Sequence, residues 1–116
     1  MLARIEDLLK DGCMLYLISE GPSFNIICKI LYKKDKEKPS PKPEECPELF
    51  DQNVKELLVD HPLVLIRACE GKFICKTYCS LVGFNHPHIG IGDSIIASIV
   101  NILEEIKREH IENPWP

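Results

Sequence analysis

Two pairs of apolar segments, each pair joined by a short turn, limit most strongly what this chain can fold into. The first pair covers residues 13–18 and 24–32, and the second covers residues 63–69 and 73–82. Side chains of similar polarity recur at every second position of 24–32 and 73–82, which is the periodicity of a strand. Hairpins that follow one another along a chain favour a single antiparallel sheet, so we expect four strands in two hairpins.

The first of these strands has no polar face. Residues 13–18 are apolar at every position, which is typical of a strand buried on both faces. In the next segment, Ile27 and Leu31 lie among the polar alternate positions, so its second face is also partly apolar. We therefore expect the sheet to have more apolar surface than three short helices cover, and such a surplus usually marks a partner surface.

Helical periodicity predicts three helices around the sheet. The first runs from Leu2 to about Asp11, and the second covers residues 48–59. The third follows Asp93 and Ser94, either of which suits its N-cap, and residues 83–92 are expected to form a connection before it. The sequence thus predicts an α+β fold in the order α-β-β-α-β-β-α, with a four-stranded antiparallel sheet and helices mainly on one face.

A segment rich in proline and lysine, at about residues 33–46, separates the two halves of the pattern. Pro39, Pro41 and Pro43 occupy alternate positions there, and proline prevents both helix and central strand. We therefore expect a surface loop. Each half of the chain is too small to bury a core of its own, so residues 1–116 are predicted to form a single α+β domain.

Composition narrows the classes of protein to consider. Hydrophobic residues make up 45% of the chain and charged residues 28%, with a net charge of −4, which excludes a disordered or fibrous chain. The mild acidity gives no overall attraction to nucleic acid or to anionic lipid. The longest uncharged apolar runs fall well short of the roughly 20 residues that span a bilayer, and the start of the chain has no apolar signal core. We expect a cytoplasmic protein with no membrane contact.

Six cysteines are many for a chain of this length. Cys28, Cys69, Cys75 and Cys79 fall inside expected strands, where a free thiol behaves as a small hydrophobic group. Since disulfides belong to oxidising compartments, we interpret these cysteines as reduced packing residues.

The densest group of polar candidates includes Cys79, Asn85, His86, His88 and Asp93. Histidine and cysteine are zinc ligands, and a cysteine beside a histidine can also act as nucleophile and base, with Asp93 orienting the base. The spacing completes neither a zinc pattern nor a catalytic signature. We therefore expect no metal, no cofactor and no enzymatic activity, and keep these five residues as a candidate polar cluster.

Lysine is concentrated in one region, which forms a candidate basic patch. Such a patch suits phosphate binding, and it equally suits a solvated sheet edge that resists pairing with other strands. Its members are Lys29, Lys33, Lys34, Lys36, Lys38 and Lys42.

Two short stretches resemble known families. Gly92-Asp-Ser-Ile-Ile-Ala97, with Asn101-Ile-Leu-Glu-Glu-Ile106 after it, resembles the strand-to-helix junction of HicB-like antitoxins, and this resemblance implies a regulatory, nucleic-acid-binding domain. A helix and several strands followed by His86-Pro87-His88 look like the order in ubiquitin-conjugating enzymes and RWD domains, where a His-Pro-Asn turn precedes the catalytic cysteine. No cysteine follows residue 79, so this second resemblance implies a catalytically inactive member.

Taken together, these patterns favour a non-enzymatic protein-interaction module. We expect a second copy of the chain, or another protein, as its partner, because surplus apolar sheet surface is the most prominent feature. A nucleic-acid-binding or antitoxin-like domain and an inactive ubiquitin-conjugating-enzyme-like or RWD-like fold are the alternatives.

Overall fold

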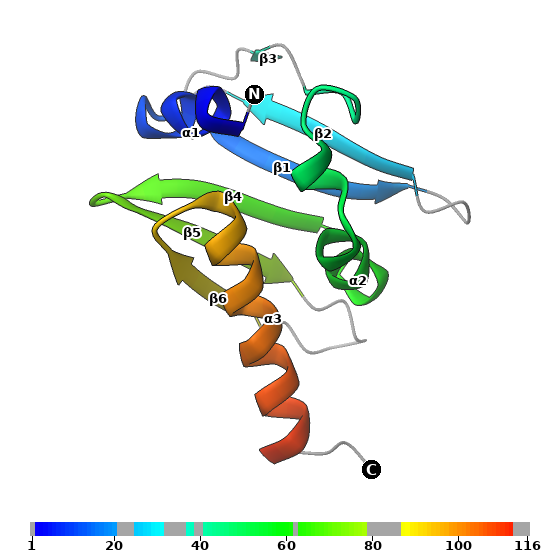
Figure 1. Cartoon of the computed structure of the whole chain (residues 1–116). Helices are drawn as coiled ribbons and strands as arrows, with labels where there is room; N and C mark the ends of the chain where they lie inside the picture. Colours follow the sequence, from blue (N-terminus) through cyan, green and yellow to red (C-terminus); the bar gives the residue numbers. More distant parts are fainter. Residues whose placement is uncertain are drawn as a thin grey trace.

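The chain folds into an antiparallel sheet with its helices against one face, and Figure 1 shows this arrangement in a computed structural model. The structure describes residues 2–20, 25–31, 37–38, 41–61, 63–78 and 87–112. Its strands are β1 (Met14–Glu20), β2 (Asn25–Leu31), β3 (Glu37–Lys38), β4 (Leu63–Cys69), β5 (Lys72–Tyr78) and β6 (Pro87–Gly92). Its helices are α1 (Leu2–Lys10), a 3₁₀ turn (Pro47–Phe50), α2 (Gln52–Asp60) and α3 (Ile95–Glu112).

The sheet has the strand order β3-β2-β1-β4-β5-β6, with every neighbouring pair antiparallel. The α+β class and both hairpins are therefore confirmed. The expected number of four strands is wrong for the described residues, because the sheet there contains β6 and the two-residue strand β3 as well. β6 lies where a connection was expected, and β3 lies inside the proline- and lysine-rich segment.

The core lies between the sheet and the helices. Alternate strand residues such as Leu15, Leu17 and Ile66 are 0% exposed, whereas their neighbours along the strands keep contact with solvent. α1 contributes Ile5 and Leu9 to this core. Burial at every second position means that the described helices cover one face of the sheet, which we call the covered face.

The two glycines of β6 allow α3 to lie directly on the sheet. A Cβ atom built on Gly90 would stand 2.5 Å from the backbone nitrogen of Ile102 and 2.5 Å from the carbonyl oxygen of Ser98. Gly92 meets the backbone of Ala97 and Ser98 in the same way. Glycines that suggest a turn in the sequence thus belong to a strand under a closely packed helix.

Ser94, not Asp93, caps α3. The Ser94 hydroxyl accepts a hydrogen bond from the Ala97 N–H at 3.0 Å, as an N-cap side chain does. A carboxylate from α1 adds to this cap, since Glu6 accepts the N–H of Ile95 at 2.9 Å. The start of the last helix is therefore tied to the first.

The expected helix over residues 48–59 is divided in two. Asp51 has an extended backbone, with φ −80° and ψ 179°, and its carboxylate accepts the N–H of Val54 at 3.0 Å. An N-cap at this position ends the 3₁₀ turn and starts α2. The apolar stripe is preserved across the break, because Leu49, Val54 and Leu57 are all buried.

The segment between β2 and α2 differs from a simple surface loop. Glu37 and Lys38 pair with β2, and Pro41 is buried. The rest of residues 32–40 lies outside the described part. Within that part, none of the helices has the length and apolar character needed to cross a bilayer.

Candidate functional site

Only two members of the candidate polar cluster, His88 and Asp93, lie within the described residues, and these two are apart. Cys79, Asn85 and His86 lie outside the described residues. His88 is near the start of β6, and Asp93 follows its end, so roughly 15 Å of extended chain separates them. Asp93 forms an exposed ion pair with Lys72. The proximity of His88 to Cys79, Asn85 and His86 therefore stays a prediction.

His88 lies beside a histidine that the sequence analysis had not singled out. Its ring packs edge-on against His61, with centroids 5.7 Å apart and planes at 86°. His61 is buried, and its Nδ1 lies 3.2 Å from the carbonyl oxygen of Leu57. Thr77, which is opposite His88 in the sheet, is fully buried, and its hydroxyl has no hydrogen-bond partner in the described structure.

We next compared this small polar group with the ligand set that a metal ion requires. In the part of the chain that the structure describes, no three His, Cys, Asp or Glu side chains are close enough together to hold a metal ion. The pair of rings at the end of α2 has the geometry of a packed aromatic contact between the helix and β6.

Burial makes the thiols of Cys28 and Cys75 poor nucleophiles. Burial raises the pKa of Cys28 and of Cys75 from 9.0 to about 12, and it also raises the pKa of Cys46. Thiols with such values stay protonated at neutral pH and react slowly. Cys28 and Cys75 are buried as expected, but the packing interpretation is wrong for Cys69, which is exposed at the end of β4.

The candidate basic patch is only partly described. Lys29 is exposed on β2, and Lys42 is exposed in the segment before the 3₁₀ turn. The backbone of Lys38 belongs to β3, while Lys33, Lys34 and Lys36 lie outside the described residues.

The second face of the sheet presents apolar side chains that are partly exposed. We call it the open face, because the described helices pack on the covered face (Figure 1). Cross-strand register arranges thirteen of its residues in three rows: Ile27–Ile18–Leu63, then Lys29–Tyr16–Leu65–Lys76–Ile89, then Leu31–Met14 on one side with Arg67–Ile74–Ile91 on the other. The pairs Glu20–Asn25 and Cys69–Lys72 lie at the ends of the same face.

Ten of the thirteen side chains in these rows are aliphatic, aromatic or methionine. Most are half-buried by their neighbours, while Leu63 is 37%, Ile89 43% and Ile91 53% exposed. The three charged members, Lys29, Arg67 and Lys76, are all cations. A sheet face of this kind can bind an apolar surface of a partner. Its cations would attract an acidic partner and repel a basic one.

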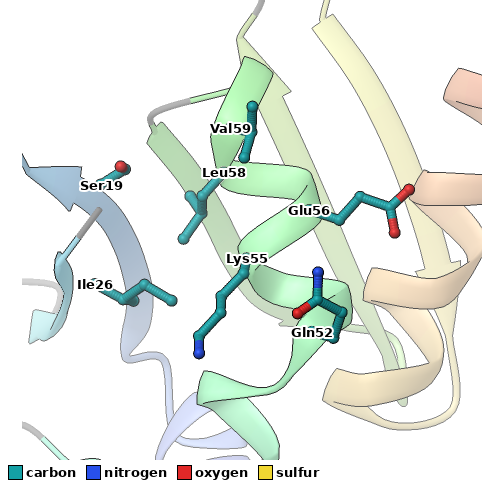
Figure 2. Close-up of a pocket in the computed structure, with 7 residues that line it drawn as sticks. All are labelled: Ser19, Ile26, Gln52, Lys55, Glu56, Leu58 and Val59. Atoms are coloured by element: carbon teal, nitrogen blue, oxygen red, sulfur yellow. The ribbon is translucent and has the colours of Figure 1, made fainter. Parts of the chain in front are cut away.

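A separate pocket lies on the helix side, between α2 and the ends of β1 and β2. It encloses about 390 Å³, and in Figure 2 Lys55 and Leu58 point from α2 toward Ile26. Gln52, Glu56, Val59 and Ser19 complete its lining. These side chains include neither a histidine nor a cysteine.

No protein-family model, no curated protein and no solved structure matches this chain. The resemblances to HicB-like antitoxins and to ubiquitin-conjugating enzymes therefore stay predictions. Pro87 and His88, which carry part of the second resemblance, begin strand β6.

Proposed function

We propose that this chain is a non-enzymatic protein-interaction module that self-associates through the open face of its sheet. The observation that supports this proposal is the set of apolar rows on the face opposite the helices, which includes Leu63, Ile89 and Ile91 as exposed members. The alternation along β1 makes the same point, because Tyr16 and Ile18 on the open face keep an exposed fraction while Leu15 and Leu17 have none.

The size of the open face fits a small dimer interface. Five strands of six or seven residues, spaced about 4.8 Å apart and rising about 3.3 Å per residue, cover roughly 500 Å². Two copies packed face to face would bury about 1,000 Å² in total, which reaches the lower limit of specific interfaces. The association we expect is therefore reversible and of modest affinity.

The cations of the open face determine how this association responds to salt. Lys29 and Arg67 of one copy would face a surface that carries the same cations, and like charges oppose the contact. Their long apolar stems can still lie on the face while the charges reach its rim. Because salt screens this repulsion, self-association should become tighter as salt rises, whereas binding to an acidic partner should become weaker.

Light scattering and sedimentation over a concentration series test the proposal. Leu63→Lys adds a cation to the open face, and we expect it to weaken the dimer by about tenfold or more. Val59→Lys is the matched control, since Val59 is 58% exposed on α2, and it should leave the dimer unchanged. A chain that stays monomeric at high concentration and high salt, or a dimer that Val59→Lys disrupts instead, would contradict the proposal.

One observation favours a second candidate, the binding of single-stranded nucleic acid. Tyr16 lies next to Lys29 in the middle row of the open face, and an aromatic ring beside a cation on an exposed sheet is how several such domains stack bases. Fluorescence anisotropy with mixed-sequence RNA and DNA should then show binding that falls with salt and with Lys29→Gln. Binding that is absent, or unaffected by salt, would remove this candidate. Either form of the module fits the cytosolic location that we propose.

A further inference from the structure

The outer edge of β6 presents backbone groups that pair with no described strand. β6 pairs with β5 on one side and is the last strand of the sheet on the other. The carbonyl of Ile91 accepts a hydrogen bond from the Asn101 side chain at 2.6 Å, so it points away from β5. Since backbone directions alternate along a strand, the N–H and C=O of Ile89 point to the same outer edge.

A groove runs along this edge, between β6 and the outer side of α3. It has a volume of about 510 Å³ and is lined by Ile89, Gly90 and Ile91 from the strand. Asn101, Glu104, Glu105 and Arg108 line it from the helix. In Figure 1 the C-terminal half of α3 continues past the sheet beyond β6, so the helix borders the space that a further strand would occupy.

We propose that this edge groove binds an extended segment of a partner protein as an additional antiparallel strand, with basic side chains toward α3 and apolar side chains toward the open face. The proposal rests on the proposed function, because it names a partner for an interaction module. Backbone groups on an unpaired edge are the usual anchor for such strand addition, and neighbouring side chains select the sequence.

Charge determines the preference on the helix side of the added strand. Glu104 and Glu105 lie side by side along the groove, with Arg108 as the single cation among its lining residues. Alternate side chains of an added strand would face α3, so lysine or arginine at those positions would meet these carboxylates. On the opposite side, apolar residues would pack beside Ile89 and Ile91, which are 43% and 53% exposed.

A second copy of β6 does not suit the same groove. The α3 helix of that copy would accompany its β6, because α3 packs so closely on β6 that a Cβ atom at Gly90 would clash with the helix backbone. Two such helices would meet on the same side of the joined sheet and bring the carboxylates of Glu104 and Glu105 from both copies together. A free extended segment carries no such helix.

In the unbound chain, Asn101 occupies the acceptor that an added strand needs. Its amide donates to the Ile91 carbonyl, and that carbonyl retains a second lone pair for the incoming N–H. The Ile91 carbonyl therefore has a hydrogen bond in the unbound chain and can still accept a second one from a partner strand. Asn101→Leu should leave peptide binding intact, since the acceptor is the backbone of Ile91.

Synthetic peptides test this inference directly. The probe is a capped, fluorescent heptapeptide in which valine alternates with lysine, and its partner peptide has glutamate in place of lysine. Two further peptides have the lysine sequence with every second backbone amide N-methylated. The first peptide is methylated at the odd-numbered amides and the second at the even-numbered amides, so each blocks one edge of the peptide strand. We expect the lysine peptide to bind about tenfold more tightly than the glutamate peptide, and only one of the two methylated sets to abolish binding.

The protein side supplies the controls. The double variant Glu104→Gln, Glu105→Gln should remove the preference for lysine, and peptide binding should slow amide hydrogen exchange at Ile89 and Ile91 about tenfold or more. Measured at protein concentrations where the chain is monomeric, peptide affinity should not change in Leu63→Lys, which tests self-association, so the two proposals fail independently. Lack of binding, equal affinity for both peptides, or equal effects of the two methylated sets would each overturn the edge assignment.

Discussion

Replacing Gly90 with alanine tests whether α3 lies as close to the sheet as the structure shows. The new Cβ would stand 2.5 Å from two backbone atoms of α3, whereas ordinary contact begins at 3.4 Å. Neither neighbour is the flexible end of a side chain, so the helix as a whole has to move by about 1 Å. That movement would loosen Ile95, Ile99 and Ile102, each of which is 0–1% exposed.

The cost follows from the rigidity of both partners. Overpacking a well-filled interior costs about 1–3 kcal/mol, and a clash with helix backbone belongs at the upper end of that range. We therefore expect Gly90→Ala to lower the free energy of unfolding by about 3 kcal/mol, a large part of the roughly 5–15 kcal/mol that holds a domain together. For a chain of this size the melting temperature should fall by about 12 °C.

Urea titrations followed by circular dichroism provide the measurement, with Gly12→Ala as the comparison. A Cβ on Gly12 meets nothing within 4 Å, but its φ of +106° strains any other residue. Strain of that kind costs about 1–2 kcal/mol. If Gly90→Ala proves no more destabilising than Gly12→Ala, the close approach of α3 to β6 is wrong, and with it the shape of the edge groove.

Three further predictions concern the cap of α3, a buried hydroxyl and two buried thiols. Ser94→Ala removes the hydroxyl that caps α3 and should cost about 1 kcal/mol in thermal unfolding, with an unchanged melting curve as the contrary result. Thr77→Val replaces a buried hydroxyl that lacks a partner in the described structure and should raise stability by about 1 kcal/mol, so a clear loss would point to a hydrogen bond from elsewhere in the chain. Because burial raises the pKa of Cys28 and Cys75 to about 12, unfolded thiols ionise first as pH rises. Their contribution to stability is complete below the ordinary pKa of 9.0 and is lost between there and about 12, so urea midpoints should fall over this range and fall less in Cys28→Ala and Cys75→Ala.

Periodicity in the sequence was sufficient to predict the elements in which apolar side chains mark the buried positions and polar side chains the exposed ones. Leu2–Lys10 and the hairpin β4–β5 match the expected helix and strand pair because each has one consistently buried set of residues. β6 was missed because Gly90 and Gly92, which occupy its covered face, leave no side chain to show a strand period. Glycine is required at these two positions because the backbone of α3 lies against them, and this contact between distant parts of the chain leaves no local pattern in the sequence.

The site was less predictable than the fold, because it depends on register. An apolar run over residues 13–18 suggested burial on both faces, whereas the described structure covers one face fully and leaves the other half-exposed. That difference is what makes the open face a candidate interface. His61, which directly follows α2, contacts His88 of β6, and the spacing of 27 positions in the sequence could not indicate this contact.

The open face and the edge groove share Ile89 and Ile91, so their occupation should be coupled. A strand added along β6 would widen the apolar face by one strand and cover the outer flank of these two side chains. A wider face buries more area when two copies pack together, and apolar burial is the main favourable term in association. Saturating lysine peptide should therefore tighten self-association, and by thermodynamic linkage a dimer should bind the peptide more tightly than a monomer does. If the peptide instead dissociates the dimer, the two surfaces compete for the same side chains, and self-association and strand addition belong to alternative states of the chain.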